Sequence, residues 1–169
     1  MIEAGILSAA DRVELIDGEV VEMSPIGSRH AACVDRLNQI LNRLVSDRFI
    51  VRVQNPICLD DYSEPQPDLC LLQPRADFYA QTHPTPADVL LVVEVADSSA
   101  GFDREVKLPL YAQDAVPEVW IINLPADIVE IYSQPAGGKY QKSQELQRGE
   151  VIKSETISQI SLDANAVLG

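Results

Sequence analysis

The sequence predicts an α/β or α+β fold in which helices flank a β-sheet. Apolar residues recur at every third or fourth position between residues 31 and 45, which is the spacing of one buried helix face. Residues 89–93 and 119–122 are continuously apolar, as is typical of central strands covered on both faces. A helical segment between these strands predicts a right-handed crossover, and the alternating residues beyond 128 indicate a β-rich C-terminal segment.

The composition is that of a globular protein, with 46% apolar and 23% charged residues in a chain of 169. A chain of this length can fold without disulfides or a structural metal, so we expect a single domain over residues 1–169. Its 13 basic and 26 acidic residues give a net charge of −13, which argues against a general affinity for polyanions. Any nucleic-acid site must therefore be local.

Cysteine usage and the N-terminus predict a cytoplasmic protein. Cys33, Cys58 and Cys70 are odd in number and widely spaced, which indicates buried thiols in a reducing compartment and neither a disulfide framework nor a zinc site. Residues 1–5 lack the basic flank and apolar run of a signal peptide. No stretch approaches the roughly 20 apolar residues of a membrane helix, so no membrane partner is expected.

A β-hairpin is predicted over residues 12–23. Asp17-Gly18 accepts the positive φ angles of a two-residue turn, and the flanking residues pair across it. In this register Glu14 lies opposite Val21 and shares one face with Glu19 and with apolar side chains. That mixed face is an unusual place for two carboxylates.

A long helix is expected to follow, with Ser28 as its N-cap. Arg29, Arg36 and Arg43 recur every seven residues and so form a loose basic stripe on this helix. The stripe is either a solvated helix face or a surface that meets phosphates. His30, in the first turn, is a candidate to contact a phosphate or orient a water, although a lone histidine also serves as a cap or packing residue.

The crossover helix is expected to begin near residues 97–99, which supply capping side chains, and to run to about residue 114 with a kink at Pro109. Short apolar runs bounded by Asp, Pro or Ser predict strands before it at residues 49–53, 56–59 and 69–72. Alternating residues predict strands after it at 128–133, 140–146 and 151–157.

Two carboxylates stand at the ends of predicted strands. Glu94 ends the most apolar strand, where an ionised carboxylate needs a partner unless it simply reaches solvent. Asp68 opens the strand at 69–72, a place where a turn-forming aspartate is the ordinary interpretation. A pair of carboxylates from neighbouring strands is able to hold Mg²⁺, which prefers oxygen ligands. Lys107, on the crossover helix, is either a solvated charge or a lysine that returns over the end of the sheet.

Several short motifs occur in order between about Arg12 and Tyr140. They are Glu14-Leu15-Ile16-Asp17-Gly18-Glu19, Ser24-Pro25 with His30, Pro67-Asp68-Leu69, Val93-Glu94-Val95-Ala96-Asp97-Ser98-Ser99, Asp103-Arg104 with Lys107, and Tyr111-Ala112 before Pro117-Glu118-Val119-Trp120-Ile121. With these motifs the chain resembles the Uma-two family of restriction endonucleases, which is similar to the PD-(D/E)XK nuclease superfamily. The resemblance implies a restriction-endonuclease-like α/β core, a mixed sheet flanked by helices, with the N-terminal hairpin and the β-rich C-terminal segment added to it.

The resemblance also implies roles for individual residues. Asp68 and Glu94 become ligands of Mg²⁺ or Mn²⁺, the carbonyl of Val95 a candidate third ligand, and Lys107 the catalytic lysine. The superfamily pattern places its lysine two residues after the glutamate, where this chain has Ala96. The lysine is therefore implied to have moved onto the following helix.

Two auxiliary residues complete the implied site. The superfamily's additional acid maps onto Glu14 or Glu19 of the hairpin, of which we favour Glu14. His30 is the second auxiliary residue.

The resulting hypothesis is a metal-dependent endonuclease that hydrolyses DNA phosphodiester bonds through Asp68, Glu94 and Lys107. The net charge argues against an efficient nuclease acting alone, and a homodimer or higher homo-oligomer would bring two basic helix stripes together. A non-catalytic binding or assembly protein with the same fold is one alternative, and a phosphohydrolase of a smaller substrate is another.

Overall fold

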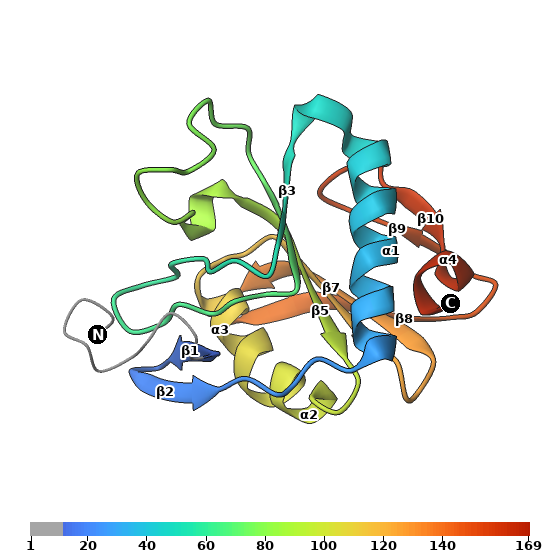
Figure 1. The fold of residues 1–169 in the computed structure, drawn as a ribbon, viewed down its shortest axis with the longest axis horizontal. Helices are drawn as coiled ribbons and strands as arrows, with labels where there is room; N and C mark the ends of the chain where they lie inside the picture. The colour runs from blue at the N-terminus through green and yellow to red at the C-terminus, as the bar shows by residue number, and fades with distance from the viewer. Residues whose placement is uncertain (1–11) are drawn as a thin grey trace.

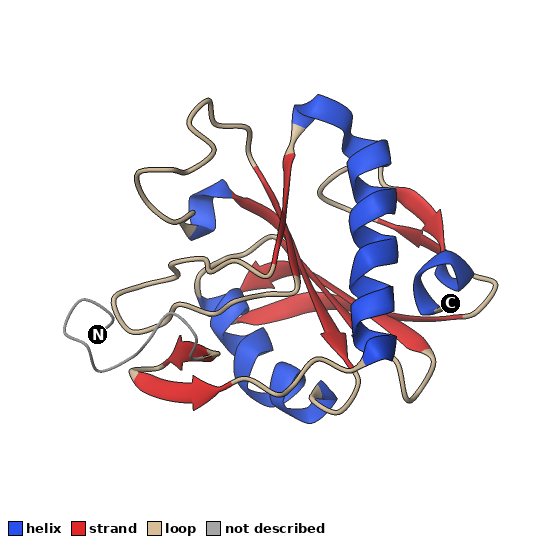
Figure 2. Ribbon diagram, in the orientation of Figure 1, coloured by secondary structure: helices blue, strands red, loops and turns tan. Residues whose placement is uncertain are grey.

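The computed structural model describes residues 12–169, which build a mixed α/β fold around a six-stranded sheet (Figure 1). The strand order is β3-β4-β5-β6-β7-β8, with β5 and β6 parallel and the other neighbours antiparallel. Helices lie on both sides of this sheet, as Figure 2 shows, so the predicted mixed sheet flanked by helices is confirmed. The strands of the sheet are β3 (Ile50–Val53), β4 (Leu69–Leu72), β5 (Val89–Ala96), β6 (Glu118–Asn123), β7 (Ile128–Ala136) and β8 (Lys139–Gln147).

Two smaller sheets and several helices surround this core. The smaller sheets pair β1 with β2 and β9 with β10. The elements outside the central sheet are β1 (Val13–Ile16), β2 (Glu19–Glu22), α1 (Ser28–Val45), the 3₁₀ helices η1 (Ser46–Arg48) and η2 (Pro86–Asp88), α2 (Ala100–Phe102), the π-helical η3 (Asp103–Lys107), α3 (Leu108–Gln113), β9 (Val151–Lys153), β10 (Ser161–Asp163) and α4 (Ala164–Leu168).

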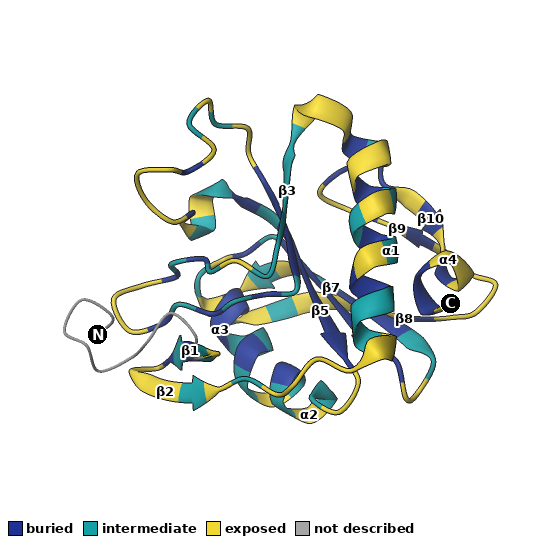
Figure 3. Cartoon of the chain, in the orientation of Figure 1, coloured by how far each residue is buried: buried dark blue, intermediate teal, exposed yellow. Residues whose placement is uncertain are grey.

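Each face of the sheet has its own hydrophobic cluster, and β5 contributes to both. Val93 and Val95 pack in the cluster that contains α1, α4 and the β9–β10 sheet, whereas Val92 and Ala96 pack in the cluster that contains α3. Side chains alternate along a strand, so Glu94 belongs to the α3 face. Figure 3 shows β5 dark along its length, while α1 is buried on one side and exposed on the other.

The N-terminal hairpin has the predicted register, with Glu14 opposite Val21 and Ile16 opposite Glu19. Asp17 and Gly18 form its turn with positive φ angles of 50° and 82°, which is the reason for the Asp-Gly dipeptide at this place. The loop after β3 holds the hairpin, because Tyr62 accepts a backbone hydrogen bond from Gly18 at 2.7 Å and Glu64 forms a bridge with Leu15.

The crossover helix differs from the prediction in its middle. It begins at Ala100, after an N-cap at Ser99, and five residues from Asp103 to Lys107 form a π-helical turn before α3. The N–H of Leu108 bonds to the carbonyl of Asp103, five residues back, immediately before Pro109, which has no N–H to donate. The wider turn accommodates the proline without ending the helix. It also leaves Asp103 and Lys107 both buried on the same side.

Three local predictions are wrong. Residues 56–59 form no strand, because Ile57 and Leu59 donate their N–H groups to Pro65 and Ser63 of the same loop. The strand predicted over 151–157 ends at Lys153, and the chain returns through β10 and α4, a helix that the alternating pattern did not predict. The N-cap of α1 is Gly27, with no side-chain hydrogen bond, so Ser28 is the first helical residue.

Cys33 and Cys70 are buried free thiols, as predicted, and Cys58 is a half-buried one. Among residues 12–169, none of the helices combines the length and the apolar character needed to cross a membrane. The signal-peptide prediction concerns residues 1–5, which lie outside the described residues.

Glu118, at the start of β6, is a fully buried carboxylate that fastens the C-terminal segment to the sheet. Its Oε1 accepts a hydrogen bond from Trp120 Nε1 at 2.7 Å. Its Oε2 accepts from Ser154 Oγ at 2.8 Å and from the backbone N–H groups of Glu155 and Thr156 at 3.1 and 2.9 Å. These four donors compensate for the loss of water around the carboxylate.

Replacing this carboxylate should destabilise the whole fold. Glu118→Ala leaves four buried donors without an acceptor, so we expect the free energy of unfolding to fall by about 3 kcal/mol in urea titrations. Glu145→Ala, on exposed β8, is the control and should change it by less than about 0.5 kcal/mol. Equal effects of the two substitutions would contradict the role of Glu118.

Candidate active site

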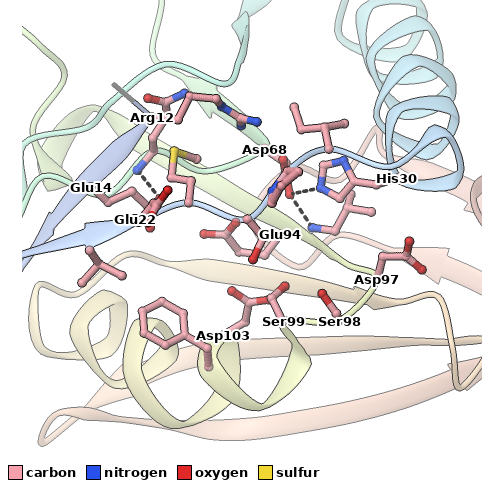
Figure 4. A pocket seen from close by; sticks show the side chains of 18 of the residues that line it. Arg12, Glu14, Glu22, His30, Asp68, Glu94, Asp97, Ser98, Ser99 and Asp103 are labelled. Carbon is pink, nitrogen blue, oxygen red and sulfur yellow. Dashed lines mark hydrogen bonds and ion pairs between the residues drawn. The ribbon is translucent and has the colours of Figure 1, made fainter. Parts of the chain in front are cut away.

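The predicted site residues meet at a pocket of about 480 Å³ beside the end of β5 (Figure 4). The hairpin and the segment after it, the first turn of α1, the end of β5 and the α2–η3 turns form its walls. Glu19, the alternative to Glu14, is exposed and lies outside the lining of the pocket. The predicted residues that line the pocket are Glu14, His30, Asp68, Glu94, Val95 and Lys107.

Glu94 is buried at the end of β5, on the face covered by the crossover helix. Its Oε1 accepts hydrogen bonds from the Tyr111 hydroxyl at 2.6 Å and from Lys107 Nζ at 3.3 Å. Within residues 12–169 both hydrogen bonds reach the same oxygen, so Oε2 keeps its lone pairs. Burial raises the pKa of Glu94 to about 8, against the opposing influence of Lys107.

Lys107 is the buried cation of the site. Its Nζ lies 2.8 Å from Glu14 Oε1, closer than to Glu94. Burial by itself would lower the pKa of Lys107, but the charges of Glu94 and Glu14 outweigh burial and raise it above the ordinary value. Lys107 therefore stays charged at neutral pH, whereas the carboxyl group of Glu94 readily holds a proton.

Glu14 also ties the hairpin to the sheet. Its Oε1 accepts from the backbone N–H of Gln66 at 2.8 Å in addition to the bond from Lys107. One carboxylate oxygen of the hairpin thus accepts hydrogen bonds from the loop before β4 and from the crossover helix. This contact explains why Glu14 is buried on a hairpin face that it shares with Ile16 and Val21.

Asp68 stands at the start of β4, next to the end of β5. Its Oδ2 accepts from the backbone N–H of Val95 at 2.8 Å and faces His30 Nε2 at 3.1 Å, and its Oδ1 accepts from Gln54 Nε2 at 3.2 Å. The last residue of β5 paired with β4 is Val93, which lies opposite Leu69. In an extended strand the N–H and C=O of one residue point to the same side, so the carbonyl of Val95 faces the side on which Asp68 lies.

His30 connects α1 to this carboxylate. The hydrogen bond with Asp68 raises the pKa of His30, although partial burial opposes the shift. Its other ring nitrogen, Nδ1, is buried and has no hydrogen-bond partner among residues 12–169. Its position orients Asp68 from the side opposite to Glu94, as Figure 4 shows.

Two buried residues of the pocket region had no role in the sequence analysis. Tyr111 is fully buried, and burial raises its pKa well above the ordinary value, so its hydroxyl stays protonated and donates to Glu94. Asp103 lines the pocket beside Lys107, and burial raises its pKa as well. Both lie four residues from Lys107 along the helix, and this spacing is the signal that could have identified them.

Most of the arginines considered in the sequence analysis are bound elsewhere. Arg29 and Arg36 donate to the backbone carbonyls of Leu124 and Val167. Arg29 and Arg43 are exposed, as expected of a solvated helix face, whereas Arg36 is half-buried. Arg104 forms a two-bond ion pair with Glu130 of β7.

A divalent cation fits the oxygen donors of this pocket. Asp68 and Glu94 supply carboxylates from the neighbouring strands β4 and β5, and Val95, whose N–H donates to Asp68, directly follows Glu94. Among residues 12–169, no three His, Cys, Asp or Glu side chains converge into a complete metal site. A cation here would therefore rely on the backbone carbonyl and on water, as Mg²⁺ commonly does.

Comparison with known proteins agrees with this fold. A crystal structure described as a putative nuclease belonging to DUF820, from Anabaena variabilis ATCC 29413, superposes with a TM-score of 0.77. The two chains are 12% identical, and the match covers 98% of this chain and 94% of the other, so it shows a shared fold. No curated protein matches the sequence.

A family model gives the stronger relationship. The model of the Uma2 family, described as "Putative restriction endonuclease", matches residues 5–165. This range contains every residue that the sequence and the pocket identify as a candidate for chemistry. The protein belongs to the Uma2 family.

Proposed function

We propose that the protein is a divalent-metal-dependent endonuclease that hydrolyses DNA phosphodiester bonds. The observation that carries this proposal is the meeting of Glu94 and Lys107, 3.3 Å apart, at the end of a buried strand next to Asp68. The family description and the printed title of the Anabaena structure support a nuclease activity. Fold alone does not specify a reaction, so the proposal depends on the site.

In this proposal Asp68, Glu94 and the carbonyl of Val95 hold Mg²⁺ or Mn²⁺. Such a cation, when bound, lowers the pKa of a water and neutralises charge that develops on the phosphate. Asp68 is ready for this role because His30, Gln54 and the N–H of Val95 hold its carboxylate in one orientation. Glu94 is held in the same way by Tyr111.

Lys107 supplies the positive charge that the chain itself brings to the reaction. Because its pKa is raised, it acts as an ammonium group that orients the attacking water and stabilises the negatively charged transition state. Removal of a proton by Lys107 itself does not fit this pKa. Glu14 is auxiliary, since it positions the ammonium by the contact at 2.8 Å.

We further propose that the protein acts in the cytoplasm, where its three thiols remain reduced. The homodimer or higher homo-oligomer expected from the sequence stays a prediction. The exposed edge strand β8, in the β-rich C-terminal segment, offers a surface for such pairing. Light scattering of the protein in solution measures its molar mass and so tests the dimer directly.

The first test uses Glu94. We expect wild type to bind one Mn²⁺ per chain by calorimetry and to cleave DNA with Mg²⁺ or Mn²⁺. Glu94→Gln removes one of two carboxylate ligands while keeping its size, so Mn²⁺ affinity should fall about 100-fold and cleavage should be lost. Glu105→Gln, on the exposed side of η3, is the control and should change neither quantity. Cleavage by Glu94→Gln at the wild-type rate would rule out the proposed mechanism.

The second test separates metal binding from catalysis. Lys107→Met keeps much of the side-chain volume but removes the ammonium, so cleavage should slow by about 100-fold or more while Mn²⁺ binding persists. Lys139→Met, on exposed β8, is the control. Thermal unfolding checks that each variant is folded. A folded Lys107→Met protein with normal cleavage would leave Lys107 without a catalytic role.

The third test uses pH. The pKa of Glu94 rises from 4.5 to about 8 on folding, so the folded state holds an additional proton between these values and loses stability as pH rises through them. The raised pKa of Lys107 acts only above its ordinary value of 10.5 and does not affect this range. In EDTA, wild type should lose about 2 kcal/mol more unfolding free energy between pH 6 and 9 than Glu94→Gln. Parallel pH profiles would show that Glu94 is ionised throughout.

A further inference from the structure

The groups proposed to act on the phosphate lie well below the surface. The exposed fractions of the side chains are 4% for Glu14, 5% for Glu94, 8% for Lys107 and 14% for Asp68. The hairpin and residues 22–27 wall them on one side, and residues 97–103 wall them on the other. A phosphate that contacts Lys107 must therefore enter the pocket between these walls.

The size of the pocket limits what can enter. Its volume of about 480 Å³ is in the range of pockets that enclose one small ligand, which is roughly 300–1,000 Å³. A base pair with both backbones exceeds this space, whereas one nucleotide of an unpaired strand is of suitable size.

The pocket also offers an apolar surface beside the carboxylates. Met23, Pro25, Ile26 and Phe102 line it, and Ile26 is 39% exposed. Phe102 is half-buried, yet among the described residues it does not pack with either hydrophobic cluster of the fold. An aromatic side chain in such a position can stack on any of the four bases, because each base has a π-face.

The charge of the pocket disfavours a duplex as well. Glu14, Glu22, Asp68, Glu94, Asp97 and Asp103 line it, against Arg12, Lys107 and His30 as the basic groups. A bound divalent cation offsets two of these charges and still leaves an excess of carboxylates. Duplex DNA carries one phosphate charge for about every 1.7 Å of its axis, which is twice the density of one of its strands. A single strand is therefore repelled less by the carboxylates of the pocket.

We infer that the substrate class is single-stranded DNA, which threads one nucleotide at a time past Phe102 and Ile26 to the carboxylates. This inference rests on the proposed function and narrows it. It predicts a binding site for an unpaired base in addition to a site for the phosphate. It also predicts that fully paired DNA, including its ends, is a poor substrate.

The test compares one fluorescent thymidine homopolymer with the same strand annealed to its complement. Ca²⁺ is present in the binding experiment, and anisotropy measures affinity without depending on cleavage. We expect the single strand to bind at least about tenfold more tightly than the duplex. Phe102→Ala should weaken single-strand binding about tenfold. Ile26→Ser, which replaces an exposed residue outside both hydrophobic clusters, should also weaken single-strand binding. Phe78→Ala removes an exposed aromatic residue outside this pocket and should have no effect.

Equal or tighter binding of the duplex would overturn the inference, and so would the absence of binding to either DNA form. Unchanged single-strand binding by both Phe102→Ala and Ile26→Ser would overturn it too. The same preference is expected in cleavage with Mn²⁺. Efficient cleavage of fully paired DNA would reject this inference and keep the proposed endonuclease, whereas failure of wild type to bind Mn²⁺ would reject the proposed function itself.

Discussion

The structure depends on one electrostatic constraint, the burial of the Glu94 carboxylate at the end of an apolar strand. A carboxylate in that position must be protonated, hydrogen-bonded or paired with a cation, because isolated burial of its charge costs several kcal/mol. The chain meets this constraint with Tyr111 and Lys107 from the crossover helix, and Glu14 from the hairpin then pairs with Lys107. Two peripheral elements are thereby fixed against the sheet.

The same contacts organise the chemistry. Tyr111 and Lys107 both donate to Oε1 of Glu94. Asp68, at the start of the neighbouring strand β4, is oriented by His30, Gln54 and the N–H of Val95. The π-helical turn from Asp103 to Lys107 brings the lysine to the sheet within a helix that must also accommodate a proline. π-Helical turns of this kind are frequent at functional sites, where they reorient one side chain at a small local cost. In the proposed mechanism this turn lets Lys107 take the role of the lysine that the resemblance would place at residue 96.

Several charged side chains outside the pocket are hydrogen-bonded within the fold. Arg29, Arg36 and Arg104 bind carbonyls or a carboxylate within the fold, and Glu118 binds four donors of its own. These side chains therefore contribute to the stability of the fold. The pocket keeps an excess of carboxylates around one buried lysine. The proposed metal ion would offset part of this negative charge, and the proposed single strand would bring fewer phosphates to the pocket than a duplex.

The sequence by itself determined the features that depend on near neighbours. The Asp17-Gly18 turn specified the hairpin and its register, because two residues with positive φ allow one pairing of the flanking strands. Continuous apolar runs located β5 and β6, and the order of motifs located Asp68, Glu94 and Lys107. The tertiary structure alone decided that Lys107 and Tyr111 donate to Glu94 and that Glu14 of the distant hairpin pairs with Lys107. It also decided that residues 56–59 pair within their own loop and that Arg29 and Arg36 bind carbonyls. Local periodicity reports the burial of a residue, whereas the partner of a buried charge depends on contacts between distant segments.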